Sequence, residues 1–190
     1  MAATVNWIEV NGASVQTVIT TGRYASKDQY NPANAYPVVV PPSGFAYSYW
    51  KHFGLELSGS FTQCDNFRVH TSGAIKSNWL LGTGGKLMFF RRDTGDHGCP
   101  IESYEQATGV EGSTGYYGKD PVNGHDYYKS EAAEPIDADS CTSGSPLTLD
   151  TTVYTEGGTT KLLVSQLKVA DDATQGDKAT ESLTATWNEI

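Results

Sequence analysis

Apolar and polar residues alternate one by one along much of this 190-residue chain. In TESLTATW (180–187), Leu183, Ala185 and Trp187 would lie on one side of an extended strand, with hydroxyl side chains on the other. A period of two is the period of a β-strand that buries one face. No segment keeps the i, i+3, i+4, i+7 apolar spacing of a helix over three turns. The sequence therefore predicts an all-β fold.

Gly and Pro divide the chain into the strands that such a fold needs. Residues 5–21 are predicted to form a hairpin about Asn11–Gly12, because both central residues of a type I′ turn need positive φ. The other expected strands lie at 38–44, at 45–57 with a bulge at Gly54, at 60–70, in two pieces within 78–92, in two pieces within 147–169, and at 180–187. About nine to eleven strands indicate a single β-sandwich or jelly-roll-like domain over residues 1–190.

Two segments lack the alternation and are predicted to be long loops. Residues 22–37 are polar and rich in turn residues, which indicates a surface loop or arm. Residues 93–139 are rich in Gly and Tyr, and a loop of this length in a compact domain usually serves a function or an interface. Tyrosine offers the rigid amphipathic ring that contact surfaces use. The predicted interface residues are Tyr24, Tyr30, Tyr116, Tyr117, Tyr127 and Tyr128.

Charge and hydropathy exclude several classes of partner. The formal net charge is −9, which argues against nucleic-acid binding because phosphates are neutralised by clustered Lys and Arg. No apolar run approaches the length of a membrane span, and residues 1–10 do not resemble a signal peptide. The chain has three widely spaced cysteines, Cys64, Cys99 and Cys141, so reduced thiols are expected. One disulfide, within the chain or between two chains, is the alternative.

Two short motifs resemble catalytic signatures, and we interpret both as turns. LGTGGKL (81–87) lacks the Ser or Thr that follows the lysine of a phosphate loop, so a tight hairpin turn is expected. Asp93–Thr94–Gly95 matches the signature of aspartic proteases, whose chemistry needs two such carboxylates. Here one copy follows two arginines, and a charged turn is expected. No catalytic residue is assigned, and the chain is not expected to be an enzyme.

Two acidic clusters could in principle hold a metal ion. Residues 91–100 bring together Asp93, Asp96, His97 and Cys99, which are zinc-binding types at a spacing that fits no closed four-ligand pattern. Asp171, Asp172 and Asp177 carry oxygen ligands of the kind that calcium prefers, within a segment that a solvated turn explains equally. We expect neither a metal nor another cofactor.

The C-terminal segment LLVSQLKVADDATQGD, followed by ESLTATWNEI, resembles the closing hairpin of β-sandwich structural proteins in tailed-phage virions. The segment WLLGTGGKLMFFRRDTGDHGCP is similar to predicted phage structural proteins. The resemblance implies a virion component made in host cytoplasm, either a capsid decoration (cement) protein or an accessory tail or neck protein. Its partners would be capsid or tail proteins and further copies of the chain, with no nucleic acid and no membrane.

Two alternatives from other classes remain open. A carbohydrate-binding β-sandwich would use aromatic rings to stack on sugars, and neighbouring Asp or Asn to bind their hydroxyls. A hydrolase on the same fold would have Asp93 as its only candidate residue. A change in Trp and Tyr fluorescence on adding glycans would distinguish the first alternative from a virion component.

Overall fold

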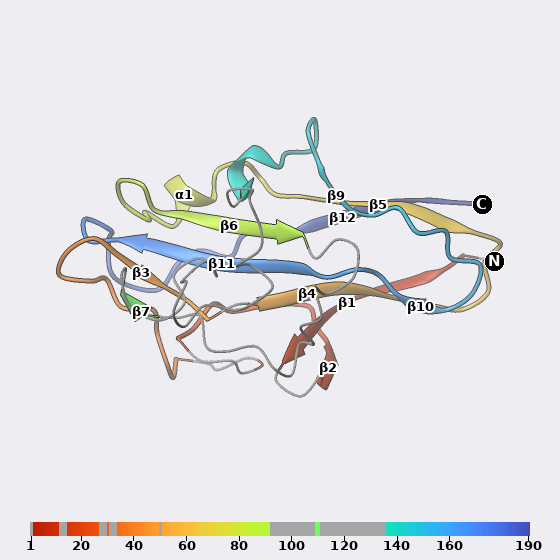
Figure 1. Cartoon of the computed structure of the whole chain (residues 1–190), viewed down its shortest axis with the longest axis horizontal. Helices are drawn as coiled ribbons and strands as arrows, with labels where there is room; N and C mark the ends of the chain where they lie inside the picture. The colour runs from red at the N-terminus through yellow and green to blue at the C-terminus, as the bar shows by residue number, and fades with distance from the viewer. Residues whose placement is uncertain are drawn as a thin grey trace.

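The computed structural model describes residues 2–11, 15–26, 30, 34–49, 51–91, 109–110 and 136–190. Within them, antiparallel strands form two sheets (Figure 1). The larger sheet comprises β1 (Thr4–Asn11), β2 (Val15–Val18), β3 (Phe45–Tyr47), β4 (Lys51–Ser58), β6 (Lys86–Arg91), β7 (Gly109–Val110), β8 (Ile136–Asp137), β10 (Gly158–Thr159) and β11 (Leu163–Ala170). The smaller sheet comprises β5 (Cys64–His70), β9 (Leu147–Asp150) and β12 (Thr184–Glu189). The helices are α1 (Ile75–Asn78) and a short 3-10 turn, η3 (Ala138–Ser140).

The prediction of an all-β fold is confirmed. The larger sheet follows the order β2-β1-β4-β11-β3-β7, and β6 pairs with β11 on the side opposite β4 and β3. The smaller sheet follows the order β12-β5-β9. The finer sandwich or jelly-roll class and the single domain over 1–190 stay predictions.

One hydrophobic core joins the two sheets. Phe53 and Leu55 of β4 belong to the same buried cluster as Phe67 and Val69 of β5. Trp187 of β12 packs against this cluster while half-buried, so it contacts the core in the orientation that the alternation of 180–187 predicts. Burial of apolar surface from both sheets is the main contribution that holds them together.

The N-terminal hairpin is confirmed, but its turn is longer than predicted. β1 pairs antiparallel with β2, and Asn11 lies opposite Val15 as the last pair. Asn11 is therefore a strand residue, not a central turn residue, and the connection runs through 12–14, which lie outside the described residues.

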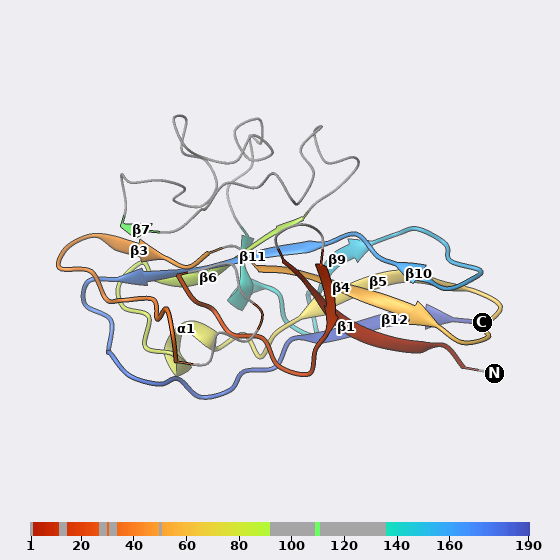
Figure 2. The ribbon, with the colours of Figure 1, turned by 90° about the horizontal axis from the view of Figure 1, so that it is seen from below.

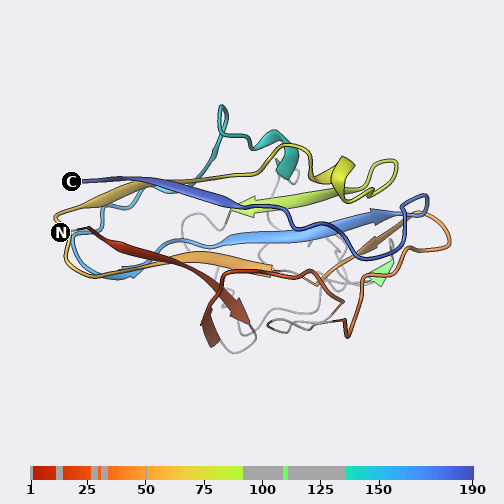
Figure 3. The same ribbon diagram turned by 180° about the vertical axis from the view of Figure 1, so that it is seen from behind.

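The predicted C-terminal hairpin is wrong. β11 lies in the larger sheet and β12 in the smaller one, and residues 171–183 cross between them past α1 (Figure 2). Hydrogen bonds hold this connector along its course, from Thr174 N to Leu80 O at 3.1 Å and from Trp79 Nε1 to Ala179 O at 2.7 Å. β9 and β11, predicted as neighbouring pieces of 147–169, likewise belong to different sheets. The two chain ends meet at one end of the molecule (Figure 3).

The strand predicted over 45–57 is divided into β3 and β4, and the break lies at 48–50, not at Gly54. Gly54 keeps a regular register with Ile8. A Cβ on Gly54 would lie 2.9 Å from Leu162 Cδ2, so a larger residue there would have to displace the Leu162 side chain, and close packing, not a bulge, accounts for the glycine.

Three other local predictions need correction. Residues 38–44 form no strand, since Pro41 and Pro42 have no N–H for a sheet. The first piece of 78–92 is the end of α1 and a turn. In β5, Asn66 has a left-handed backbone conformation (φ 55°), which interrupts the alternation of side chains. Cys64 is therefore buried, whereas regular alternation over 60–70 would place Asp65 on the same side as Phe67 and Val69.

Candidate interaction site

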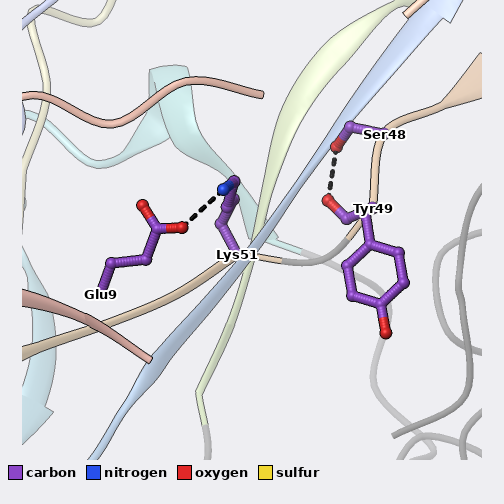
Figure 4. Close-up of polar contacts among 4 residues, drawn as sticks. All are labelled: Glu9, Ser48, Tyr49 and Lys51. Carbon is purple, nitrogen blue, oxygen red and sulfur yellow. Dashed lines mark hydrogen bonds and ion pairs between the residues drawn. The ribbon is translucent and has the colours of Figure 1, made fainter. Parts of the chain in front are cut away.

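A buried ion pair lies beneath the loop 22–37. Glu9 of β1 pairs in register with Phe53 of β4, and Lys51 lies two residues before Phe53, so both charged side chains share one face of the sheet. Glu9 Oε1 is 2.5 Å from Lys51 Nζ, and both side chains are fully buried (Figure 4). Losing one partner would leave an uncompensated charge in the interior.

Tyr24 extends this polar cluster toward the loop. Ser165 of β11 lies opposite Lys51 in the register of β4 and β11, and its Oγ is 2.6 Å from the Tyr24 hydroxyl. The Tyr24 ring meets Trp79 edge to face, with 6.0 Å between centroids. Burial raises the pKa of Tyr24 far above its ordinary value of 10.0; the hydrogen bond with Ser165 opposes the rise, and the charge of Glu9 adds to it. Tyr24 is thus a neutral phenol that anchors the start of the loop.

The loop 22–37 is held at the break between β3 and β4, and we call Ser48 and Tyr49 of this break the loop seat. Tyr49 N donates to Ala25 O at 2.7 Å, and Ala25 is buried. Ser48 Oγ donates to Tyr49 O at 2.8 Å (Figure 4) and accepts from Leu167 N at 2.9 Å. The interrupted strand therefore redirects backbone groups to the loop, and Ser48 satisfies the groups of β11 that regular pairing would otherwise satisfy.

The ends of the loop are fastened to each other. Tyr36 O accepts hydrogen bonds from Ser26 N at 2.8 Å and from Ser26 Oγ at 3.2 Å. Arg23 donates through a guanidinium nitrogen to Asn34 Oδ1 at 2.6 Å. These contacts form the loop neck, which we define as Arg23, Ser26, Asn34 and Tyr36.

Tyr36 holds an exposed ring on a strained backbone. Its φ is 59°, a left-handed conformation that costs an L residue about 1–2 kcal/mol, and Pro37 follows it. The residue is 44% exposed, as is Tyr30. Left-handed conformations of bulky residues concentrate at functional sites, where the surroundings hold them in place.

The predicted interface residues fall into two groups. Tyr24 and Tyr30 belong to the same loop; Tyr30 is exposed, whereas the hydroxyl of Tyr24 is bound inside the domain. Tyr116, Tyr117, Tyr127 and Tyr128 lie outside the described residues. Sequence reasoning did not single out Tyr36, although the dipeptide Tyr36–Pro37 at the end of a turn-rich segment was an available signal.

The glycine-rich turn does not form the hairpin that 81–87 predicts, because it connects α1 to β6. Thr83 N and Thr83 Oγ1 both donate to the Asp172 carboxylate at 2.7 Å. These two hydrogen bonds lower the pKa of Asp172. The backbone amide of this turn, which a phosphate loop would offer to its ligand, thus donates to a carboxylate of the chain itself.

Acidic side chains elsewhere also hold loops. Asp171 Oδ2 accepts from Gly44 N at 3.1 Å, and the Asp139 carboxylate accepts from Ile75 N and Lys76 N at the start of α1. In the described part of the chain, no three His, Cys, Asp or Glu side chains gather into a metal-binding group. The zinc candidates Asp93, Asp96, His97 and Cys99 lie outside that part.

Asp150 organises the connection from β9 to β11. It accepts hydrogen bonds from Thr152 N, Lys161 N and Tyr154 Oη, each at 2.9 Å. Burial raises the pKa of Asp150, but these hydrogen bonds outweigh it, and the net pKa lies below the ordinary value of 3.8. Burial and the neighbouring Asp150 raise the pKa of Tyr154. Asp150 thus serves as a fully hydrogen-bonded structural carboxylate.

Cys64 and Cys141 are free and buried, and burial raises the pKa of both thiols. Cys99 lies outside the described residues. None of the helices in the described ranges has the length and hydropathy needed to cross a bilayer.

Neither the protein-family models, nor the curated proteins, nor the solved structures contain a match to the chain. The loop 22–37, with the break between β3 and β4 that holds it and the side chains it exposes, is therefore the candidate interaction site.

Proposed function

We propose that the chain is a non-enzymatic structural protein of a bacteriophage virion, a capsid decoration (cement) protein that acts through protein–protein contacts. An accessory tail or neck protein is the alternative within the same class. The observation that carries the proposal is the exposed, strained Tyr36 ring on a loop whose neck and seat are held by hydrogen bonds. A contact residue fixed in advance loses little conformational entropy on binding.

The internal use of acidic side chains supports the same proposal. Asp139, Asp150 and Asp172 each accept two or more hydrogen bonds from other residues of the chain, at the start of α1 or in loops. Glu9 is paired with Lys51 in the interior. Carboxylates used in this way stiffen the chain, which suits a protein whose role is to add stability to an assembly by binding its folded partners.

Glycan binding is the second candidate, and the exposure of Tyr30 and Tyr36 favours it. Both residues are 44% exposed on one loop, and exposed tyrosine rings can stack on sugar rings. A shift of intrinsic fluorescence over a broad glycan panel would support this candidate, and a flat response would remove it.

The direct test is to purify the particles produced by the genome that encodes the chain and to probe them with an antibody raised against the protein. We expect the protein to sediment with intact particles through a density gradient, at a copy number comparable to that of other particle proteins. Recovery of the protein only at the top of the gradient would overturn the proposal.

A further inference from the structure

The smaller sheet packs one face on the core and turns the other toward solvent. Val69 of β5 is fully buried in the core cluster, and Ala185 of β12 packs against that cluster. Their neighbours Arg68 and Thr186 pair in register with each other, so both project from the opposite face. Both are exposed. We call this solvent-facing side of β5 and β12 the outer face.

Asp65 places a negative charge on the outer face. Its carboxylate accepts hydrogen bonds from Gln63 Nε2 at 2.6 Å and from Asn188 Nδ2 at 2.9 Å. Asn188 pairs with Asp65 in register, so the second bond joins β12 to β5. Both donors are neutral amides, and Asp65 forms no ion pair in the described part of the chain. The charge of Asp65 is therefore held in place without a cation beside it.

Arg68 places a positive charge on the same face. The register of β5 against β12 shifts between Asp65 and Arg68, and Asn66 has a left-handed φ of 55°. A bulge of this kind lets two side chains three positions apart project from one face. Arg68 Nε donates to Asn66 Oδ1 at 3.2 Å, whereas its terminal guanidinium nitrogens have no acceptor among the described residues. The outer face thus carries one positive and one negative group that do not pair with each other.

We propose that the outer face is a contact between two copies of the chain, related by a twofold axis that crosses β5 between Asp65 and Arg68. The inference rests on the proposed function as an assembly protein and names a second copy as one of its partners. A twofold contact uses the same patch on both copies, so the patch must complement itself. Rotation about this axis places Arg68 of each copy over Asp65 of the other, which gives two equivalent ion pairs.

A second copy satisfies both charged groups, whereas an acidic ligand would pair with Arg68 and leave Asp65 facing a like charge. Sheets that pack face to face lie about 10 Å apart, and each proposed pair combines a long arginine with a short aspartate across that gap. The same rotation places Thr186 over Asn188 of the other copy. The amide nitrogen of Asn188 is bound to Asp65, so its amide oxygen is left to accept from the threonine hydroxyl.

The end of the outer face adds an apolar contact. Ile190 N donates to Gln63 O at 3.0 Å, and Gln63 N donates to Ile190 O at 3.2 Å, so the pairing of β12 with β5 continues to this residue. Ile190 is 74% exposed. The hydrogen bonds that hold Asp65 and Arg68 order these side chains before the copies meet, which reduces the entropy lost on association.

The test is sedimentation equilibrium of the full chain over a series of protein concentrations at low ionic strength. The outer face spans few strands and is polar, so we expect a weak dimer that forms at the higher concentrations and dissociates as salt is added. Arg68→Glu and Asp65→Lys should each abolish the dimer over the same concentrations. Each reversal places like charges opposite each other twice in every dimer.

Mixing the two variants is the sharpest measurement. In a pair of one Arg68→Glu chain and one Asp65→Lys chain, the two new charges face each other, and the unchanged Asp65 faces the unchanged Arg68. The equimolar mixture should therefore form dimers that neither variant forms alone. Lys178→Glu is the matched control, because it reverses an exposed charge in the connector 171–183. It should dimerise as the unchanged chain does.

A melting curve of each variant shows whether it is folded. Arg68→Glu should melt close to the unchanged chain, because the Arg68 side chain bonds only to Asn66 in the described ranges. Asp65→Lys also loses the hydrogen bonds from Gln63 and Asn188. If that variant does not fold, the comparison of Arg68→Glu with Lys178→Glu still decides the proposal.

The proposal is overturned if the unchanged chain stays a monomer at every concentration, if folded Arg68→Glu dimerises as the unchanged chain does, or if the two folded variants stay monomeric when mixed. The particle experiment is independent of these outcomes. A protein found in particles that is monomeric in solution would overturn only the twofold contact, whereas a dimer absent from particles would overturn only the virion assignment.

Discussion

The ammonium of Lys51 lies 2.5 Å from the carboxylate of Glu9, and neither side chain reaches solvent. The pair joins β1 to β4 beside the break that seats Ala25. Buried pairs of this kind add little net stability over apolar residues, but the loss of one partner is costly. The pair therefore fixes how the two strands and the loop above them fit together.

Removing one member of the pair should destabilise the fold strongly. Glu9→Gln and Lys51→Met should each lower the free energy of unfolding by about 3–5 kcal/mol, because each leaves a buried charge or polar group without its partner. Urea denaturation followed by Trp fluorescence measures this loss. The double variant Glu9→Gln/Lys51→Met should recover part of it, and single-variant losses below about 1 kcal/mol would contradict a buried pair.

Tyr24 should make the protein sensitive to alkali. Its pKa is raised in the folded state, so above about pH 10 the unfolded chain releases a proton that the folded chain retains, and stability falls as pH rises. Tyr24→Phe should cost about 1–2 kcal/mol at neutral pH through the lost hydrogen bond to Ser165, but should flatten the alkaline decline. Melting temperatures across pH 10, compared with those of the exposed control Tyr30→Phe, test this. An unchanged alkaline slope in Tyr24→Phe would refute it.

Asp150 should make the protein sensitive to acid. Its pKa is lowered in the folded state, so the stability it contributes is present above about pH 4 and is lost as pH falls through the folded pKa. Asp150→Asn should lower the free energy of unfolding by about 2–3 kcal/mol at neutral pH, since hydrogen bonds to a charged acceptor are lost. Its acid transition should also be shallower. Asp177→Asn, at an exposed position, is the control and should behave as the unchanged chain.

Leu80 occupies a position that favours glycine. Leu80 N donates to Ser77 O and Leu81 N to Lys76 O, which closes α1 in a Schellman motif, and Leu80 has a φ of 50° while 52% exposed. Leu80→Gly should therefore raise the free energy of unfolding by about 0.5–1 kcal/mol. Leu80→Ala keeps the left-handed strain and should give no gain. Equal stabilities of the two variants, measured by urea denaturation, would argue against this account.

The sequence predicts the class of fold because alternation records burial directly. The strands at Thr4–Asn11, Cys64–His70, Leu163–Ala170 and Thr184–Glu189 each overlap a segment that the pattern predicts as a strand. The alternation does not record which strands pair, so the crossing of 171–183 between sheets was missed. That crossing depends on contacts such as Thr174 N to Leu80 O, between residues far apart in the chain.

The site was predicted only in outline for a similar reason. A polar, turn-rich segment with tyrosines at 22–37 is visible in the sequence, and Tyr24 and Tyr30 follow from it. The anchoring role of Tyr24 depends on its contacts with Ser165 and Trp79. The strained backbone of Tyr36 is held by a hydrogen bond from Ser26 N to Tyr36 O.

The most direct test of the account is the substitution Tyr36→Gly. Glycine accepts a φ of 59° without strain, so the variant should keep the backbone of the loop and stay folded while lacking the exposed ring. The measurement is the copy number of Tyr36→Gly on purified particles, relative to the unchanged protein supplied at the same level. We predict a markedly reduced copy number in a fully folded protein. An unchanged copy number would contradict the central claim that this loop forms the contact.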